Sequence, residues 1–209
     1  MLIYVCGIAG VGKTTICKKT AEISGGSERL IKTIPTTSII RELVWTKTEK
    51  EYSCLPEEQR RLIKPEFVKR VYLLDRQNSD TVYLFDRHLS SWDAKSGSFK
   101  IWQTPPEYQK QVFAIVFVMA PVESICARRL QDYEIRPDRH LYDPRFLKSI
   151  QRFEERTAYH RAGILRIPII TIENNEGEEL TASKNLFYFI KRTIRSIITG
   201  SDQSRAKAR

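Results

Sequence analysis

Long apolar runs are missing from this sequence. No stretch reaches the roughly 18 consecutive apolar residues that a membrane-spanning helix needs. The apolar segment at residues 1–5 is short, carries no basic leader and runs directly into a glycine-rich loop, which is not the pattern of a secretory signal peptide. We therefore expect a soluble, cytoplasmic protein without a membrane partner.

Cysteine is scarce and scattered. The four cysteines, Cys6, Cys17, Cys54 and Cys126, show no C-x-x-C spacing, which argues against a zinc site or a disulfide framework. Cys6 lies in an apolar run, and this position favours a buried, chemically inert thiol.

Acidic residues are in the minority, because 35 Lys and Arg stand against 25 Asp and Glu and give a formal charge of +10. This excess suits an anionic partner, whether a nucleotide, a nucleic acid or an acidic protein, and composition does not choose among them. Part of it lies in residues 199–209, which we expect to form a basic, disordered tail. The chain length of 209 residues suits one core, so we expect residues 1–198 to form a single domain.

Strand patterns and helix patterns alternate along the chain. The sequence predicts strands near residues 2–6, 30–34, 82–85, 112–118 and 167–172, and helices near 15–23, 56–77, 121–131, 143–163 and 181–198. Pro65 predicts a break or kink in the second helix. Alternation of this kind implies right-handed crossovers and a parallel sheet, and hence a three-layer α/β fold.

The most specific motif is a phosphate-binding loop. Residues 7–14 read Gly-Ile-Ala-Gly-Val-Gly-Lys-Thr and match the Walker A pattern G-x-x-x-x-G-K-[ST] between a strand and a helix. In such loops the lysine, here Lys13, reaches the β- and γ-phosphates of ATP, and the hydroxyl of Thr14 binds Mg²⁺. We assign nucleotide binding to Gly7, Ala9, Gly10, Val11, Gly12, Lys13, Thr14 and Thr15; the alternative is a glycine-rich turn without a ligand.

The third predicted strand runs into Asp86-Arg87-His88. Asp86 is placed to hold Mg²⁺ or to activate an acceptor oxygen, and Arg87 would face an acceptor phosphate or the transferring group. The alternative for Asp86 is a residue that caps the next turn. Four aromatic residues follow, and they form either a base-stacking surface or the anchors of their own loop: Trp92, Phe99, Trp102 and Tyr108.

Arginines are dense after the fourth predicted strand, at Arg128, Arg129, Arg136 and Arg139. Positioned guanidinium groups stabilise the charge of a transferring phosphoryl group, and a loop that carries them can exclude water. We assign this role to Arg128, Arg136 and Arg139, against the alternative of a solvated basic face. In the next helix we expect Arg156 to look inward.

In order and spacing these segments resemble the archaeal-type adenylate kinases of the P-loop nucleoside monophosphate kinase superfamily. The likeness covers nearly all of residues 1–198 and is carried by the phosphate loop, Leu-Pro-Glu-Glu-Gln-Arg at 55–60, Asp86-x-His88, the arginines at 128–139 and the closing residues 172–177. It implies a five-stranded parallel sheet, an acceptor-binding region at 35–75, a lid at 128–142 and Asn175 beside the donor base. It also implies Mg²⁺-dependent transfer of the γ-phosphoryl group of ATP to a nucleoside monophosphate.

Two features separate this chain from that family. Residues 32–37 lack the Asn-Tyr pair expected for AMP, and the added Arg87 is similar to the pattern of deoxynucleoside and thymidylate kinases. The acceptor therefore stays open as a nucleotide or a nucleoside. The sequence also allows a regulatory P-loop ATPase that binds RNA or a protein partner, and a polynucleotide 5′-kinase. No N-K-x-D segment is present to indicate GTPase-type base selection.

Overall fold

The computed structural model of the protein describes residues 1–26, 30–34, 36–44, 56–77, 80–93, 96–103, 105–132 and 143–206. Two segments named in the sequence analysis fall outside these ranges. They are residues 45–55, within the expected acceptor-binding region, and residues 133–142, which include Arg136 and Arg139.

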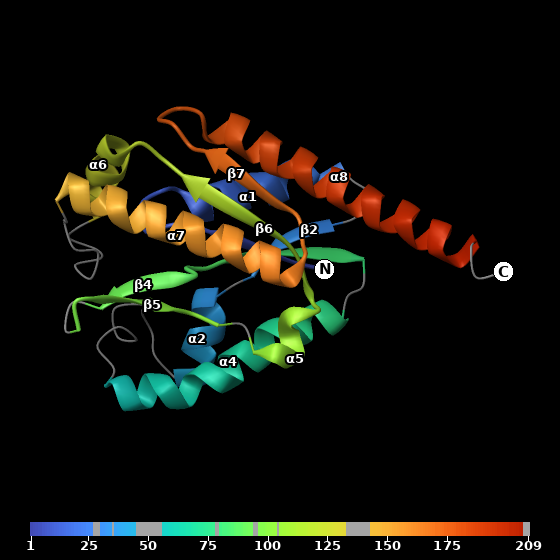
Figure 1. Ribbon diagram of the computed structural model, residues 1–209, viewed down its shortest axis with the longest axis horizontal. Helices are drawn as coiled ribbons and strands as arrows, with labels where there is room; N and C mark the ends of the chain where they lie inside the picture. Colours follow the sequence, from blue (N-terminus) through green and yellow to red (C-terminus); the bar gives the residue numbers. More distant parts are fainter. Residues whose placement is uncertain are drawn as a thin grey trace.

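A five-stranded parallel sheet forms the centre of the fold (Figure 1). Its order is β2-β3-β1-β6-β7, with β1 at Leu2–Cys6, β2 at Leu30–Thr33, β3 at Thr81–Asp86, β6 at Val112–Met119 and β7 at Ile169–Glu173. Every neighbouring pair is parallel. The predicted three-layer fold with a five-stranded parallel sheet is therefore confirmed.

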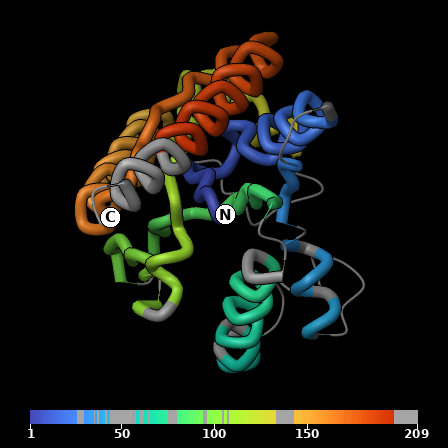
Figure 2. Tube along the Cα trace, turned by 90° about the vertical axis from the view of Figure 1, so that its right-hand side faces the viewer, coloured from blue at the N-terminus to red at the C-terminus, as the bar shows by residue number. Residues whose placement is uncertain are grey.

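Helices connect and cover these strands. Their bounds are α1 Lys13–Ile23, the 3₁₀ turn η1 Ser24–Gly26, α2 Thr36–Val44, α4 Glu57–Gln77, α5 Pro106–Gln109, α6 Val122–Asp132, α7 Pro144–Leu165 and α8 Glu179–Ala206. The helix α8 lies on the opposite side of the molecule from α2 and α4 in two perpendicular views (Figures 1 and 2).

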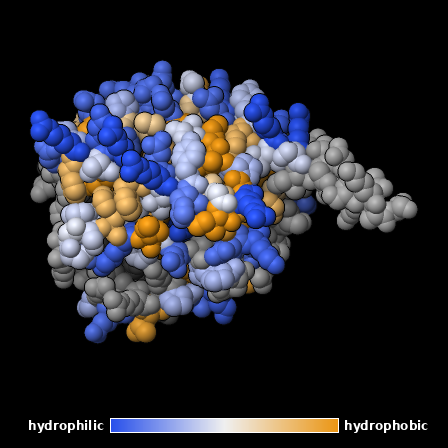
Figure 3. Space-filling model, in the orientation of Figure 1, coloured by the Kyte–Doolittle hydropathy of each residue, from blue (hydrophilic) through white to orange (hydrophobic). Residues whose placement is uncertain are grey.

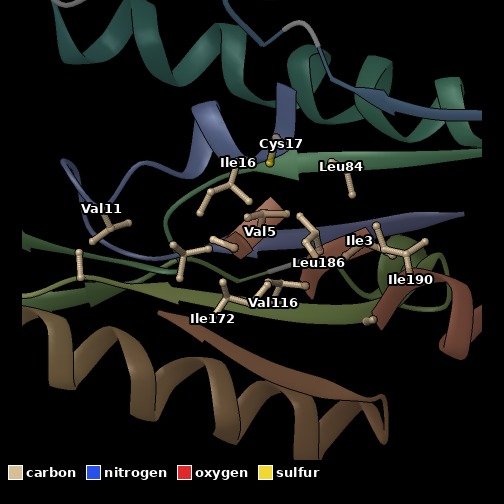
Figure 4. Packing of buried hydrophobic residues seen from close by; sticks show 14 of the residues in the cluster. Ile3, Val5, Val11, Ile16, Cys17, Leu84, Val116, Ile172, Leu186 and Ile190 are labelled. Carbon is tan, nitrogen blue, oxygen red and sulfur yellow. The ribbon is translucent and has the colours of Figure 1, made fainter. Parts of the chain in front are cut away.

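The central strand β1 is buried on both faces, as its unbroken apolar run requires. Ile3 and Val5 point into one core, which Ile16 of α1 and Leu186 of α8 complete (Figure 4). The even-numbered residues of the same strand, Leu2, Tyr4 and Cys6, point into a second core with residues of α2, α4 and the end of α7. Because successive side chains of a strand point to opposite faces of the sheet, β1 packs against the helices on both sides.

The segment between β3 and β6 differs from the expected long loop. It contains an antiparallel hairpin, β4 Ser90–Asp93 and β5 Ser98–Ile101. Its aromatic rings are anchors, since Trp92 meets Phe146 of α7 edge to face and Phe99 stacks on Phe153 of the same helix.

Helix boundaries also differ in two places. Pro65 lies inside α4, so the helix does not end there. The last helix continues to Ala206, so residues 199–206 are helical, where the sequence analysis expected a disordered tail. In the described part of the chain, no helix is both long enough and apolar enough to cross a membrane.

Two leucines of α8 allow a matched test of this packing. Leu186 is fully buried against α1, whereas Leu180 is 52% exposed. We expect Leu186→Ala to lower the free energy of unfolding by about 2–5 kcal/mol, because it leaves a cavity. Leu180→Ala should change it by less than about 0.5 kcal/mol. Urea unfolding of both variants would measure this, and equal effects would contradict the assigned core.

Candidate nucleotide-binding site

Four strands end at the same edge of the sheet, and the candidate site is built from the residues that follow them. The glycine loop follows β1, Asp86 ends β3, α6 follows β6, and Asn174 follows β7. In a parallel sheet the carboxyl ends of the strands meet at one edge, where α/β proteins bind their ligands. Residues that lie far apart in the sequence are therefore brought together around the loop.

The first carbonyl groups of the loop accept hydrogen bonds from two side chains. The Nζ of Lys13 donates to the carbonyl oxygens of Gly7 at 2.9 Å and Ile8 at 3.2 Å. The Nδ1 of His88 lies 2.7 Å from the same Gly7 oxygen, and because a carbonyl only accepts, His88 is the donor. His88 therefore fixes the backbone where the loop begins.

The next three carbonyl groups are held from the other side. Arg129 of α6 donates from Nε at 3.1 Å and Nη2 at 2.9 Å to the oxygen of Ala9. Its neighbour Arg128 donates to the oxygen of Gly10 at 3.3 Å. The buried amide of Asn174 donates to the oxygen of Val11 at 2.8 Å.

Two glycines are required by the loop's geometry. Gly12 has φ +87°, and a Cβ there would collide with the side-chain amide of Asn174. Gly7 has φ +143°, and its Cβ would collide with the carbonyl oxygen of Val118 on β6. L side chains disfavour such backbone angles, so both positions exclude any larger residue.

Lys13, Thr14 and Asp86 converge at the start of α1. The Thr14 hydroxyl donates to Asp86 Oδ2 at 2.5 Å, and Lys13 Nζ lies 3.7 Å from Asp86 Oδ1. The lysine is almost wholly buried, with 6% of its surface exposed. Hydroxyl and carboxylate oxygens are the ligands that Mg²⁺ prefers, usually one or two from the protein with the rest from phosphates and water.

This donor set fits Mg²⁺ better than a transition metal. Among the described residues, no group of three or more His, Cys, Asp or Glu side chains is arranged to hold a metal ion. The two hard oxygen donors, Thr14 and Asp86, therefore suit an ion that is bound together with nucleotide phosphates.

Arg87 lies on the other side of β3 from this cluster of donors. Its guanidinium group sits 4.7 Å from the ring centre of Tyr4 and 5.3 Å from that of Phe85. The pKa of Arg161 on α7 is lowered, mainly by burial and secondly by the nearby positive charge of Arg87. The Arg161 guanidinium donates a hydrogen bond to the carbonyl oxygen of Trp102. Two cationic groups thus share one region beside an aromatic surface.

A buried carboxylate fixes the chain that follows Arg87. Glu154 of α7 accepts a hydrogen bond from the backbone nitrogen of Leu89 at 2.6 Å and another from the Ser90 hydroxyl. These bonds tie the start of the hairpin to α7. Arg87 and His88 are consequently held between a strand and a fixed turn.

Cys6 ends β1 just before the loop and is fully buried. Burial and the negative charge of Glu154 raise the pKa of its thiol far above the ordinary value. The thiolate needed for nucleophilic chemistry is therefore suppressed, which confirms the expected inert cysteine.

Most of the expected site residues come together in the structure, including the loop residues, Asp86 and Arg128. Asn175, expected beside the donor base, donates to Glu178 at 2.7 Å, and the side chain of its neighbour Asn174 reaches the loop. Arg156 is exposed, which corrects the expectation that it looks inward. Arg136 and Arg139 lie outside the described residues.

Sequence reasoning missed the loop contacts of Arg129, His88 and Asn174. Each of them had a signal in the sequence, because a polar residue directly after a parallel strand or on the helix that follows one lies at the ligand edge of the sheet. That signal identifies the edge but not which of two adjacent side chains turns toward the loop.

Comparisons with known proteins agree with this geometry. A family model described as an AAA domain matches residues 6–142, well over half of the chain. Among curated proteins, none matches the sequence.

Solved structures share the fold, and three of those that are similar to this chain are shikimate kinases. The enzyme from Acinetobacter baumannii, in complex with shikimate, is 20% identical, with 91% of this chain and 93% of that one covered and a TM-score of 0.56. The enzyme from Bacteroides thetaiotaomicron is 14% identical, with 91% of this chain and 98% of that one covered and a TM-score of 0.52. The enzyme from Aquifex aeolicus is 13% identical, with 93% of this chain and 98% of that one covered and a TM-score of 0.50. At these identities the likeness establishes a P-loop kinase fold and nothing finer.

Two glycine substitutions test the loop geometry. We expect Gly12→Ala to abolish measurable binding of Mg²⁺-ATP, because the new methyl group would displace Asn174 from the carbonyl of Val11. Gly163→Ala, in α7, meets no atom within 4 Å and should leave binding unchanged while it stabilises the helix by up to about 1 kcal/mol. Isothermal titration calorimetry and thermal unfolding would measure both. Undiminished ATP binding by Gly12→Ala would contradict the proposed site.

Proposed function

We propose that this chain, which belongs to the AAA domain family, is an ATP-dependent phosphotransferase that moves the γ-phosphoryl group to a small nucleotide or nucleoside acceptor. The observation that carries the proposal is the convergence of Lys13, Thr14 and Asp86 at the ligand edge of the sheet. A catalytic site for phosphoryl transfer needs these three groups together: a cation for the phosphates, a hydroxyl and a carboxylate.

On the donor side, the loop would bind the phosphates of ATP. Side chains donate to the carbonyl oxygens of residues 7–11. Backbone amides of the same turn would then donate to phosphate oxygens, that of Val11 after it leaves its long bond of 3.5 Å to the Ile8 oxygen. The start of α1 adds partial positive charge. Lys13 would move from the carbonyl oxygens of Gly7 and Ile8 to the β- and γ-phosphates.

Magnesium would be held by Thr14 and Asp86. When bound, the ion neutralises the charge that builds up on the β- and γ-phosphate oxygens. Alternatively, Asp86 would accept the proton of an acceptor hydroxyl, directly or through water.

On the acceptor side, Arg87 and Arg161 favour an anionic group. Two guanidinium groups near one another repel, and an anion between them relieves that repulsion. The A. baumannii neighbour is described in complex with shikimate, which shows only that this fold accommodates small acceptors. For this chain the two arginines suit a nucleotide or nucleoside acceptor that presents an anionic or hydrogen-bond-accepting group.

The remaining assignments extend the resemblance to adenylate kinases. We infer that Arg128, Arg136 and Arg139 stabilise the transferring phosphoryl group when the segment 128–142 closes, and that Asn175 lies near the donor base. Arg128 is the one of these arginines in the described residues, and it already touches the loop.

Removal of the loop lysine tests the activity. We expect Lys13→Ala to lower kcat by at least about 100-fold, because it removes the cation that stabilises the transferring group. Lys19→Ala is the control: it removes a partly exposed lysine of the same helix, which pairs with Glu179 at 3.9 Å. Incubating ATP with a panel of nucleosides, nucleotides and oligonucleotides would identify the acceptor. If only water accepted the phosphoryl group, the chain would be a regulatory ATPase, and labelled oligonucleotide would indicate a polynucleotide 5′-kinase.

The assigned metal ligand gives a separate prediction. We expect Asp86→Asn to raise the Mg²⁺ concentration needed for half-maximal activity by about tenfold or more, because the amide carries no charge. Activity should also be lost on chelation with EDTA and return with Mg²⁺. An unchanged Mg²⁺ requirement in Asp86→Asn would remove this residue from the metal site.

A further inference from the structure

A second basic surface lies on the outer face of α7, away from the contacts of the phosphate loop. It comprises a depression of about 490 Å³ lined by Phe99, Arg145, Lys148, Ser149, Arg152, Phe153 and Arg156. We call it the α7 groove. On the face that Figure 3 shows, strongly hydrophilic and apolar residues are interleaved.

The cations of the α7 groove form a line. Arg145, Lys148, Arg152 and Arg156 follow one another at three- or four-residue intervals, which places them on one side of the helix. At 1.5 Å per residue, the line is about 16 Å long. A row of this length can contact several successive phosphates, which exceeds what one mononucleotide presents.

These four side chains are exposed. In the ranges that the structure describes, no carboxylate lies within ion-pair distance of any of them. By contrast, Lys100 on the adjacent strand β5 pairs with Asp93 at 2.7 Å. The positive potential of the groove is therefore available to an anionic partner.

Two aromatic rings border the same groove. Phe99 of β5 and Phe153 of α7 stack with centroids 4.0 Å apart, and both are partly exposed. A basic track beside exposed aromatic rings is the combination that binds single strands, whose bases are free to stack. A duplex keeps its base faces covered, so it would use the cations alone.

We propose that the α7 groove binds single-stranded nucleic acid, with phosphates along Arg145, Lys148, Arg152 and Arg156 and a base against Phe99. The inference does not depend on phosphoryl transfer, because the groove shares no residue with the Lys13–Thr14–Asp86 cluster. Binding should therefore persist in Lys13→Ala. RNA and DNA present the same chemistry to these groups, and the experiment separates them.

Fluorescence anisotropy with labelled U₁₂ RNA and dT₁₂ at low salt would test the proposal. We expect the double variant Arg152→Gln/Arg156→Gln to weaken binding at least tenfold. It should also reduce the magnitude of the slope of log K against log salt concentration by about 1.4, because each of the two lost phosphate contacts contributes about 0.7. The matched control is Lys191→Gln/Arg192→Gln, which removes two charges beside Tyr188 in a depression on α8 and should change affinity less than twofold.

Further experiments test which kind of ligand binds in the α7 groove. Phe99→Leu should weaken binding of U₁₂ or dT₁₂ about tenfold through lost stacking, with thermal unfolding to verify that the variant is folded. Tighter binding of one oligonucleotide would name RNA or DNA as the partner. The proposal would be overturned by no binding at low salt, by equal losses in both double variants, or by equal affinity for a duplex or for a polyglutamate peptide of the same length.

Discussion

The carbonyl oxygens of residues 7–11 accept hydrogen bonds from side chains, and the geometry of the whole site depends on this constraint. Within the turn's own backbone, the amide of Val11 makes one long bond of 3.5 Å to the Ile8 oxygen, and leaving buried carbonyl groups without partners would cost free energy. The donors come from α1, α6 and the residues that follow β3 and β7. The strand order of the sheet therefore determines the shape of the loop, and a change in any neighbouring strand end would alter it.

This dependence explains why two adjacent arginines of α6 differ. Arg129 is 4% exposed and directs two N–H groups at one carbonyl oxygen, so moving it would break both bonds inside the protein. Arg128 is less buried and makes two longer bonds, to Gly10 and Asn174, and these cost less to exchange for a phosphate oxygen. Burial and bond length thus separate an arginine that shapes the loop from one that can turn toward a ligand.

Sequence patterns predict the sheet, the loop and the position of Asp86 because each depends on local spacing and on the rule that parallel strands end at one edge. They do not predict which of two neighbouring side chains faces inward. Asn174 rather than Asn175 reaches the loop because of where β7 ends, and a shift of one residue reverses a side chain. The hairpin β4–β5 was missed because its strands are short and polar, and its rings pack on α7.

The distribution of charge over the described residues says more about binding than the net charge does. A formal excess of +10 is compatible with many anionic partners, and two groups of cations in the described part of the chain differ in their surroundings. Those around the phosphate loop have backbone or carboxylate partners and are largely buried, so their field acts at one point. Those along α7 are exposed, regularly spaced and flanked by aromatic rings. Cations gathered at the phosphate loop suit a small polyphosphate, whereas a row of cations along α7 suits a polyanionic polymer.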